Sequence, residues 1–123
     1  MQWLSVALGG ALGALSRYAV TLYLPVTSTH KFPFATLLVN VLGSMTMGIL
    51  YVILVERAQF SPHMHYFLTV GFLGAFTTYS TFSLDALSLW QNGGHIMAAV
   101  YVISTVVLCL LAVIGAVWLT RLI

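Results

Sequence analysis

Long apolar runs separated by short polar segments are the main pattern along this chain of 123 residues. The four runs cover approximately 2–24, 33–55, 66–90 and 96–120. Each is longer than the roughly 20 residues that a helix needs to cross the hydrocarbon core. Because a helix satisfies its own backbone amides inside lipid, the pattern predicts an all-α membrane protein, with four transmembrane helices in a single domain over 1–123.

Composition agrees with a location in the membrane. Hydrophobic residues make up 61% of the chain and charged residues only 5%, whereas about 25% of a typical soluble domain is charged. The sequence contains no nucleophile–base arrangement, no phosphate-binding loop and no basic patch suited to nucleic acid. We therefore expect neither an enzyme nor a nucleic-acid-binding protein.

Positive charges are divided almost evenly between the two ends of the predicted bundle. Arg57 and Arg121 belong to one end, and Lys31 to the other, with Arg17 seven residues inside that end of its helix. This gives little of the positive charge bias that orients most membrane proteins. Either one charge is enough to orient the chain, or copies insert in both directions. The second interpretation, dual topology, predicts an antiparallel homodimer with two-fold symmetry.

Several polar side chains fall inside the apolar runs, where each needs a partner or a hydrated cavity. Thr36, Asn40 and Ser44 are four residues apart and form one stripe on the second helix. Arg17 either attracts an anion into a vestibule or extends to the lipid headgroups. Asp85 either pairs with a base or accepts hydrogen bonds from hydroxyl groups.

The stretch GAFTTYSTFS, residues 74–83, concentrates hydroxyl groups in the third apolar run. Six of the seven residues from 77 to 83 carry one, and they cannot all lie on one helical face. Threonine is also a mediocre helix former. We therefore predict a break in the third helix near 74–78, which frees backbone groups for an ion. The alternative is an unbroken helix whose hydroxyls bond the carbonyls one turn earlier.

Two aromatic residues follow this predicted break at helical spacing. Tyr79 and Phe82 are three residues apart, and Ser80 and Ser83 repeat that spacing beside them. Because an aromatic ring has a positive edge, ring edges next to hydroxyl and amide donors suit the passage of a small dehydrated anion. Ordinary packing of the two rings is the alternative.

Three segments together resemble one known family. GGALGALSRY, ATLLVNVLGS and GFLGAFTTYSTFSLD, in this order on a four-span chain, are similar to the bacterial fluoride channel family, Fluc, also called CrcB. The resemblance implies a passive channel that exports fluoride across the bacterial inner membrane and confers fluoride resistance. It also implies an antiparallel dual-topology homodimer with two pores and a structural sodium ion at the dimer interface. Fluoride, membrane lipid and a second copy of the chain are the implied partners.

The resemblance also implies roles for individual residues by their position in these segments. Arg17 corresponds to a vestibule arginine, and the backbone carbonyls of Gly74 and Thr77 to the sodium ligands. The chain departs from the family in having Tyr79 where phenylalanine is usual. The residues that correspond to the fluoride pore are Asn40, Tyr79, Ser80, Thr81, Phe82 and Ser83.

Two other functions are compatible with a small four-span protein. A small multidrug transporter resembles this chain in size and dual topology, but such proteins carry a glutamate in the first helix. The first run here contains no acidic residue, only Arg17. A non-transporting membrane scaffold is the other alternative, and it predicts that the polar stripes are dispensable.

Overall fold

The computed structural model describes residues 1–25 and 32–123, and every regular element in this part of the chain is helical. Lys31, which entered the charge argument, lies outside the described residues. The elements in chain order are α1 (Gln2–Tyr23), α2 (Phe34–Leu50), η1 (Tyr51–Glu56), α3 (Pro62–His65), η2 (Tyr66–Leu73), α4 (Gly74–Phe76), α5 (Tyr79–Gln91) and α6 (His95–Leu122). The segments η1 and η2 are π-helical.

Three helical spans among the described residues are long and apolar enough to cross a membrane: Phe34–Glu56, Pro62–Gln91 and His95–Leu122. Their bounds agree with the second, third and fourth apolar runs within a few residues. The helix α1 is not among them. It has 22 residues, and its apolar run is interrupted by Arg17. A fourth transmembrane span over 2–24 therefore stays a prediction.

The third span begins four residues earlier than the apolar pattern predicted. Ser61 caps α3, because its side chain accepts a hydrogen bond from the backbone N–H of Met64 at 3.4 Å. Pro62 occupies the first helical position, where its fixed φ angle is favourable and its missing N–H costs nothing. The polar residues before 66 thus belong to the helix start.

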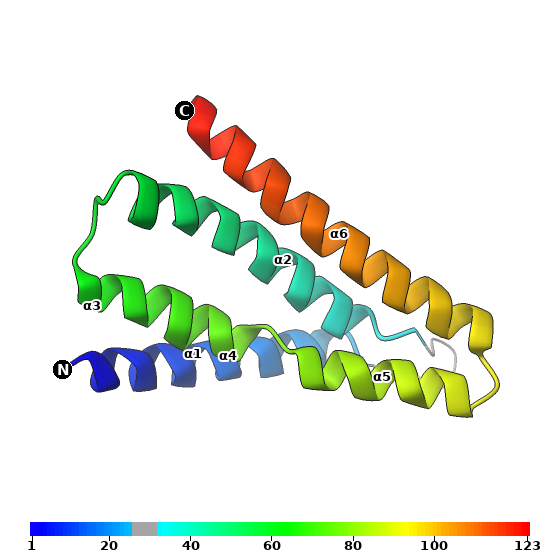
Figure 1. Cartoon of the computed structure of the whole chain (residues 1–123). Coiled ribbons are helices and arrows are strands. Elements are labelled where there is room, and N and C mark those ends of the chain that lie inside the picture. The colour runs from blue at the N-terminus through cyan, green and yellow to red at the C-terminus, as the bar shows by residue number, and fades with distance from the viewer. Residues whose placement is uncertain (26–31) are drawn as a thin grey trace.

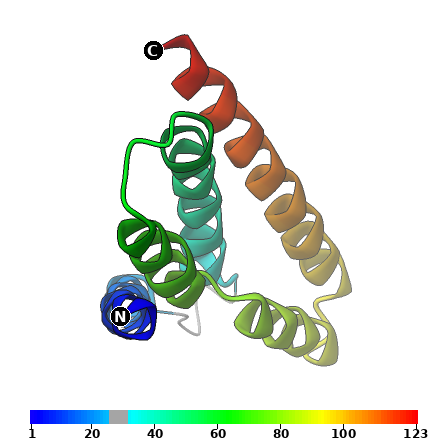
Figure 2. The ribbon, with the colours of Figure 1, turned by 60° about the vertical axis from the view of Figure 1, so that its left-hand side comes forward.

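The helices form an up-and-down bundle whose third member is interrupted (Figure 1). Both termini and the connection between η1 and α3 lie toward one end, and the turn between α5 and α6 lies at the other. The helix α1 packs along η2 and α4, while α2 packs along α6. Figure 2 shows α6 diverging from the third span as it approaches the C-terminus.

The helices α1 and η2 pack so closely that their backbones touch. A Cβ atom at Gly9 would lie 2.2 Å from the carbonyl oxygen of Phe67, and one at Gly13 would lie 2.1 Å from that of Phe72. Only glycine permits this approach. The GxxxG pair therefore packs within the chain, against the parallel third span.

The predicted break in the third helix is confirmed. The helix α4 ends at Phe76, and Thr77 and Thr78 have extended backbones with ψ angles of 158° and 114°. Thr78 then caps α5, since its hydroxyl oxygen accepts the backbone N–H of Thr81 at 3.2 Å. The alternative of an unbroken helix is wrong, because the capping hydroxyl of Thr78 competes successfully with the helical ladder.

Candidate ion pathway at the helix break

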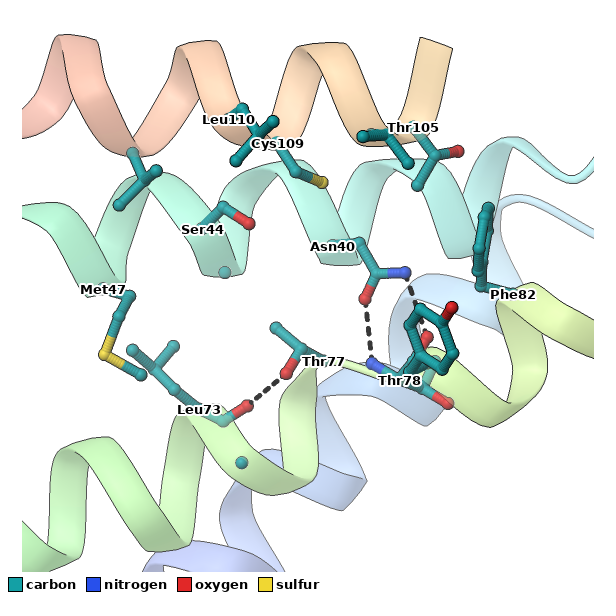
Figure 3. Close-up of a pocket in the computed structure, with 15 residues that line it drawn as sticks. Asn40, Ser44, Met47, Leu73, Thr77, Thr78, Phe82, Thr105, Cys109 and Leu110 are labelled. Atoms are coloured by element: carbon teal, nitrogen blue, oxygen red, sulfur yellow. Dashed lines mark hydrogen bonds between the residues drawn. The ribbon is translucent and has the colours of Figure 1, made fainter. Parts of the chain in front are cut away.

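The side-chain amide of Asn40 pairs with the backbone of Thr78 at the break (Figure 3). Its Nδ2 donates to the Thr78 carbonyl at 3.0 Å, and its Oδ1 accepts the Thr78 N–H at 2.8 Å. Three residues further along α2, Gly43 makes room for the break, since a Cβ atom there would lie 2.1 Å from Cγ2 of Thr77. The second span is thus shaped to receive the interruption in the third.

Two backbone carbonyls at the break lose the donors that a continuous helix would give them. The N–H of Thr78, one turn beyond Gly74, bonds Asn40 in place of the Gly74 carbonyl. The N–H of Thr81 bonds the Thr78 hydroxyl in place of the Thr77 carbonyl. The Thr77 carbonyl accepts instead from Nη1 of Arg17 at 3.2 Å. The sequence predicted freed carbonyls here, but it did not predict that Arg17 reaches one of them.

A groove of about 490 Å³ opens between α2, the break and α6. We call it the break groove; Figure 3 shows residues that line it. Five of the residues assigned by resemblance line it: Asn40, Gly74, Thr77, Tyr79 and Phe82. From α6 it also receives Thr105, which is only 5% exposed and whose hydroxyl has no hydrogen-bond partner among the described residues. By its spacing, Thr105 shares a helical face with Tyr101 and Ser104, but the resemblance assigned it no role.

A second cavity of about 400 Å³ lies on the other side of Thr78. We call it the Arg17 cavity, and Thr36 and Thr81 line it together with Arg17. Thr78 lines both this cavity and the break groove. The predicted site is therefore divided in two at the break. The predicted pore residues Ser80 and Ser83 are not in the lining of either cavity.

The hydroxyl groups of the predicted track differ in what they can still donate. Ser83 donates its proton to the Tyr79 carbonyl at 2.9 Å. Thr78 donates to the hydroxyl oxygen of Thr81 at 3.0 Å, so its contact with Ser80 at 3.3 Å uses the proton of Ser80. Each hydroxyl has one proton. Of these four groups, Thr81 is the one whose own proton these bonds leave available.

The two aromatic residues of the predicted pore lie close together but in different surroundings. Their ring centroids are 5.5 Å apart. Phe82 is buried, and its ring packs 5.3 Å from that of Tyr101. Tyr79 is 80% exposed and extends into the open side of the break groove. Phe82 therefore has a fixed position, whereas most of the Tyr79 side chain has no neighbours among the described residues.

Asp85 accepts hydrogen bonds from two hydroxyl groups. Thr36 donates to its Oδ2 at 2.7 Å, and Tyr101 donates to the same oxygen at 3.2 Å. The sequence had left a basic partner and hydroxyl partners as alternatives, and the structure provides the hydroxyls. The residues of the polar stripe on α2 therefore have different partners. Thr36 donates to Asp85, whereas Asn40 and Ser44 line the break groove.

Known proteins match this chain along almost its whole length. Residues 4–117 match the family described as CrcB-like protein, Camphor Resistance (CrcB). A protein of Saccharophagus degradans named "Fluoride-specific ion channel FluC" is 54% identical over 120 residues, which cover 97% of this chain and 89% of that protein. Proteins with the same name from Hahella chejuensis and Magnetococcus marinus are 48% and 44% identical, and the matches cover 96% and 91% of this chain and 93% and 91% of those proteins. This chain belongs to the CrcB-like family.

Proposed function

We propose that this protein is a channel that lets fluoride leave the cell passively through the inner membrane of a bacterium. The observation that carries the proposal is the match of nearly the whole chain to relatives named as fluoride-specific ion channels. Hydrogen fluoride is a weak acid, so the neutral acid crosses lipid and dissociates in a neutral cytoplasm. A selective pore then returns the trapped anion down its gradient and makes the cell resistant to fluoride.

The groups at the break are suited to replacing water around a small anion. One N–H of Asn40 is bonded to Thr78, and the second N–H of the same amide remains a donor on the side of the break groove. Phe82 offers a ring edge in a fixed position beside it. Thr81 adds a free hydroxyl proton in the Arg17 cavity, where the guanidinium charge attracts an anion. Selectivity would follow from donors in a narrow passage.

The working unit that we propose is an antiparallel homodimer in which a second copy seats on the break groove. The groove is open and largely apolar along α6, where it meets Val106, Leu110 and Val113. Tyr79 projects into it with most of its ring uncovered. A partner copy would complete the walls of the pathway and bury this ring. Antiparallel packing accords with the nearly even distribution of Lys and Arg in the sequence.

Reporters fused to the C-terminus are expected to be active on both sides of the membrane, and a signal from one side alone would contradict dual topology.

A sodium ion held at the break is a further part of the proposal. The residues fit such an ion in two respects: the Gly74 carbonyl is released from the Thr78 N–H, and Gly74 and Thr77 both line the break groove. Unwound carbonyls are typical ligands of sodium in transport proteins. One chain supplies the Gly74 carbonyl and the second lone pair of the Thr77 carbonyl, whose first lone pair accepts from Arg17. A partner copy would supply the remaining ligands. Bound there, the ion would hold the two chains together, because carbonyl oxygens of both would coordinate it.

Fluoride efflux from liposomes that contain the purified protein tests the function. The vesicles are loaded with potassium fluoride, a potassium carrier balances the charge, and an electrode records fluoride outside. Vesicles loaded with potassium chloride are the matched control and are expected to retain their chloride. Efflux of a cationic dye driven by a proton gradient, without fluoride efflux, would favour the multidrug transporter instead. Vesicles that release neither would favour the scaffold.

A further inference from the structure

A stripe on α1 connects the close helix contact to the break in the third span. Gly9, Gly13 and Arg17 are four residues apart and share one helical face. The two glycines bring the backbone of α1 against that of η2. One turn further along, the guanidinium of Arg17 reaches the break and donates to the Thr77 carbonyl at 3.2 Å. The glycine contact thus fixes where along the third span Arg17 can bind.

The Thr77 carbonyl needs a donor from outside its own helix. Its helical donor, the N–H of Thr81, is used by the Thr78 hydroxyl. An unsatisfied carbonyl at this depth in a membrane is costly, because no bulk water can replace the missing bond. The two extended residues of the break are therefore held from two sides: Thr78 by Asn40 on α2, and Thr77 by Arg17 on α1.

We propose that Arg17 is a positioning residue of the break, in addition to any attraction that its charge exerts on an anion. Its hydrogen bond fixes the peptide plane between Thr77 and Thr78, and this plane sets the direction in which α5 leaves the break. Because Phe82 lies in the first turns of α5 and packs against Tyr101, its ring depends on that direction. Arg17 thereby acts on the pathway through the backbone.

Lysine and methionine variants separate positioning from charge attraction. Arg17→Lys keeps the positive charge but loses the planar fork and some reach, so it retains attraction and weakens the bond to Thr77. Arg17→Met removes both. Arg57→Met is the matched control, because Nη2 of Arg57 also donates to a backbone carbonyl of another helix, that of Thr120 at 2.8 Å, far from the break.

Two readouts report on the break without any ion flux. One is amide hydrogen exchange in the peptide that contains Thr78 and Thr81. The other is the ¹⁹F resonance of a single 4-fluorophenylalanine placed at position 82, measured on the folded dimer fraction. A role in overall stability alone would reduce the folded fraction and leave this resonance in place. Fluoride efflux is recorded on the same preparations, and only this third readout rests on the proposed channel function.

We expect both Arg17→Lys and Arg17→Met to raise exchange in this peptide by about tenfold or more, since a hydrogen bond from a charged donor is weakened in the first variant and lost in the second, in a locally opening segment. Both are expected to move the ¹⁹F resonance and lower efflux, while Arg57→Met changes none of the three. The proposal is overturned if Arg17→Lys keeps the wild-type exchange and resonance. Absence of fluoride efflux from the wild-type protein would contradict the channel function and leave the exchange and ¹⁹F results to decide the role of Arg17.

Discussion

The side-chain amide of Asn40 forms two hydrogen bonds with the backbone of Thr78, one to its carbonyl and one from its N–H. The second of these bonds replaces the backbone carbonyl that the Thr78 N–H would bond in a continuous helix. This pair gives Asn40 two tasks. It satisfies the carbonyl and the N–H of Thr78, and its second N–H remains a donor beside the break groove, where we propose that the anion passes. An amide is the side chain that has both a donor and an acceptor in this arrangement.

Asn40→Asp is expected to remove most fluoride efflux and to loosen the break. A carboxylate cannot donate to the Thr78 carbonyl, and its charge repels an anion in the same groove. Loss of the bond should lower the free energy of unfolding by about 1–3 kcal/mol. Efflux and thermal unfolding of the purified protein measure the two effects. Asn92→Asp adds the same charge in the exposed turn after α5 and serves as control. Wild-type efflux from Asn40→Asp would exclude Asn40 from the pathway.

The two tyrosines at the site should respond differently to removal of their hydroxyl groups. Tyr79→Phe is expected to change stability by no more than about 0.5 kcal/mol and to preserve efflux, because it keeps the ring and removes only a hydroxyl that has no hydrogen bond among the described residues. Tyr101→Phe is expected to cost about 1–3 kcal/mol, because its hydroxyl donates to Asp85 in a buried position. Thermal unfolding compares the pair directly. Equal effects would mean that the Tyr101 bond contributes little.

Glycine substitutions on α1 test the contact that delivers Arg17 to the break. Gly13→Ala places a methyl group 2.1 Å from the Phe72 carbonyl oxygen, so α1 and η2 must move apart. We expect a loss of about 1–3 kcal/mol in unfolding free energy. Gly10→Ala is the control, because nothing lies within 4 Å of the new methyl group. It should be neutral or stabilise α1 by up to about 1 kcal/mol. If both variants unfold alike, the close contact does not exist in the membrane.

Removal of sodium tests the proposed ion at the break. Dialysis into buffer in which potassium replaces sodium at equal ionic strength should lower fluoride efflux or convert dimer to monomer on a sizing column. Restoring sodium should reverse the change. The proposed ion would have no support if efflux and dimer content stay the same in sodium-free buffer.

The helices and the break were predictable because they depend on local sequence. Apolar runs of sufficient length define the spans, and the hydroxyl-rich stretch after Gly74 carries its own capping residue, Thr78. The π-helical segments η1 and η2 were not predicted. They insert an extra residue per turn without a distinctive composition, so the sequence contains no clear signal for them.

The contacts between helices were less predictable because they depend on how each helix is rotated about its axis. The sequence placed Asn40 and Arg17 inside the apolar runs as candidate site residues. It could not specify that they bind the adjacent carbonyls of Thr78 and Thr77. It also treated Ser80 and Ser83 like Thr81, although only Thr81 lines a cavity. Ser80 and Ser83 also use their hydroxyl protons in local hydrogen bonds to Thr78 and Tyr79, whereas Thr81 accepts from Thr78 and keeps its own proton.

Fluoride efflux from liposomes containing Phe82→Ile, compared with Phe76→Ile, tests most directly whether the break region conducts the anion. Both phenylalanines are buried, 7% and 9% exposed, but only Phe82 lines the break groove. Isoleucine keeps apolar bulk and removes the ring edge, so both variants are expected to retain a dimer on a sizing column with somewhat lower stability. Phe82→Ile should lose most of the efflux, and Phe76→Ile should keep it. A well-folded Phe82→Ile dimer with wild-type efflux would contradict the account, because the ring would then only pack the protein.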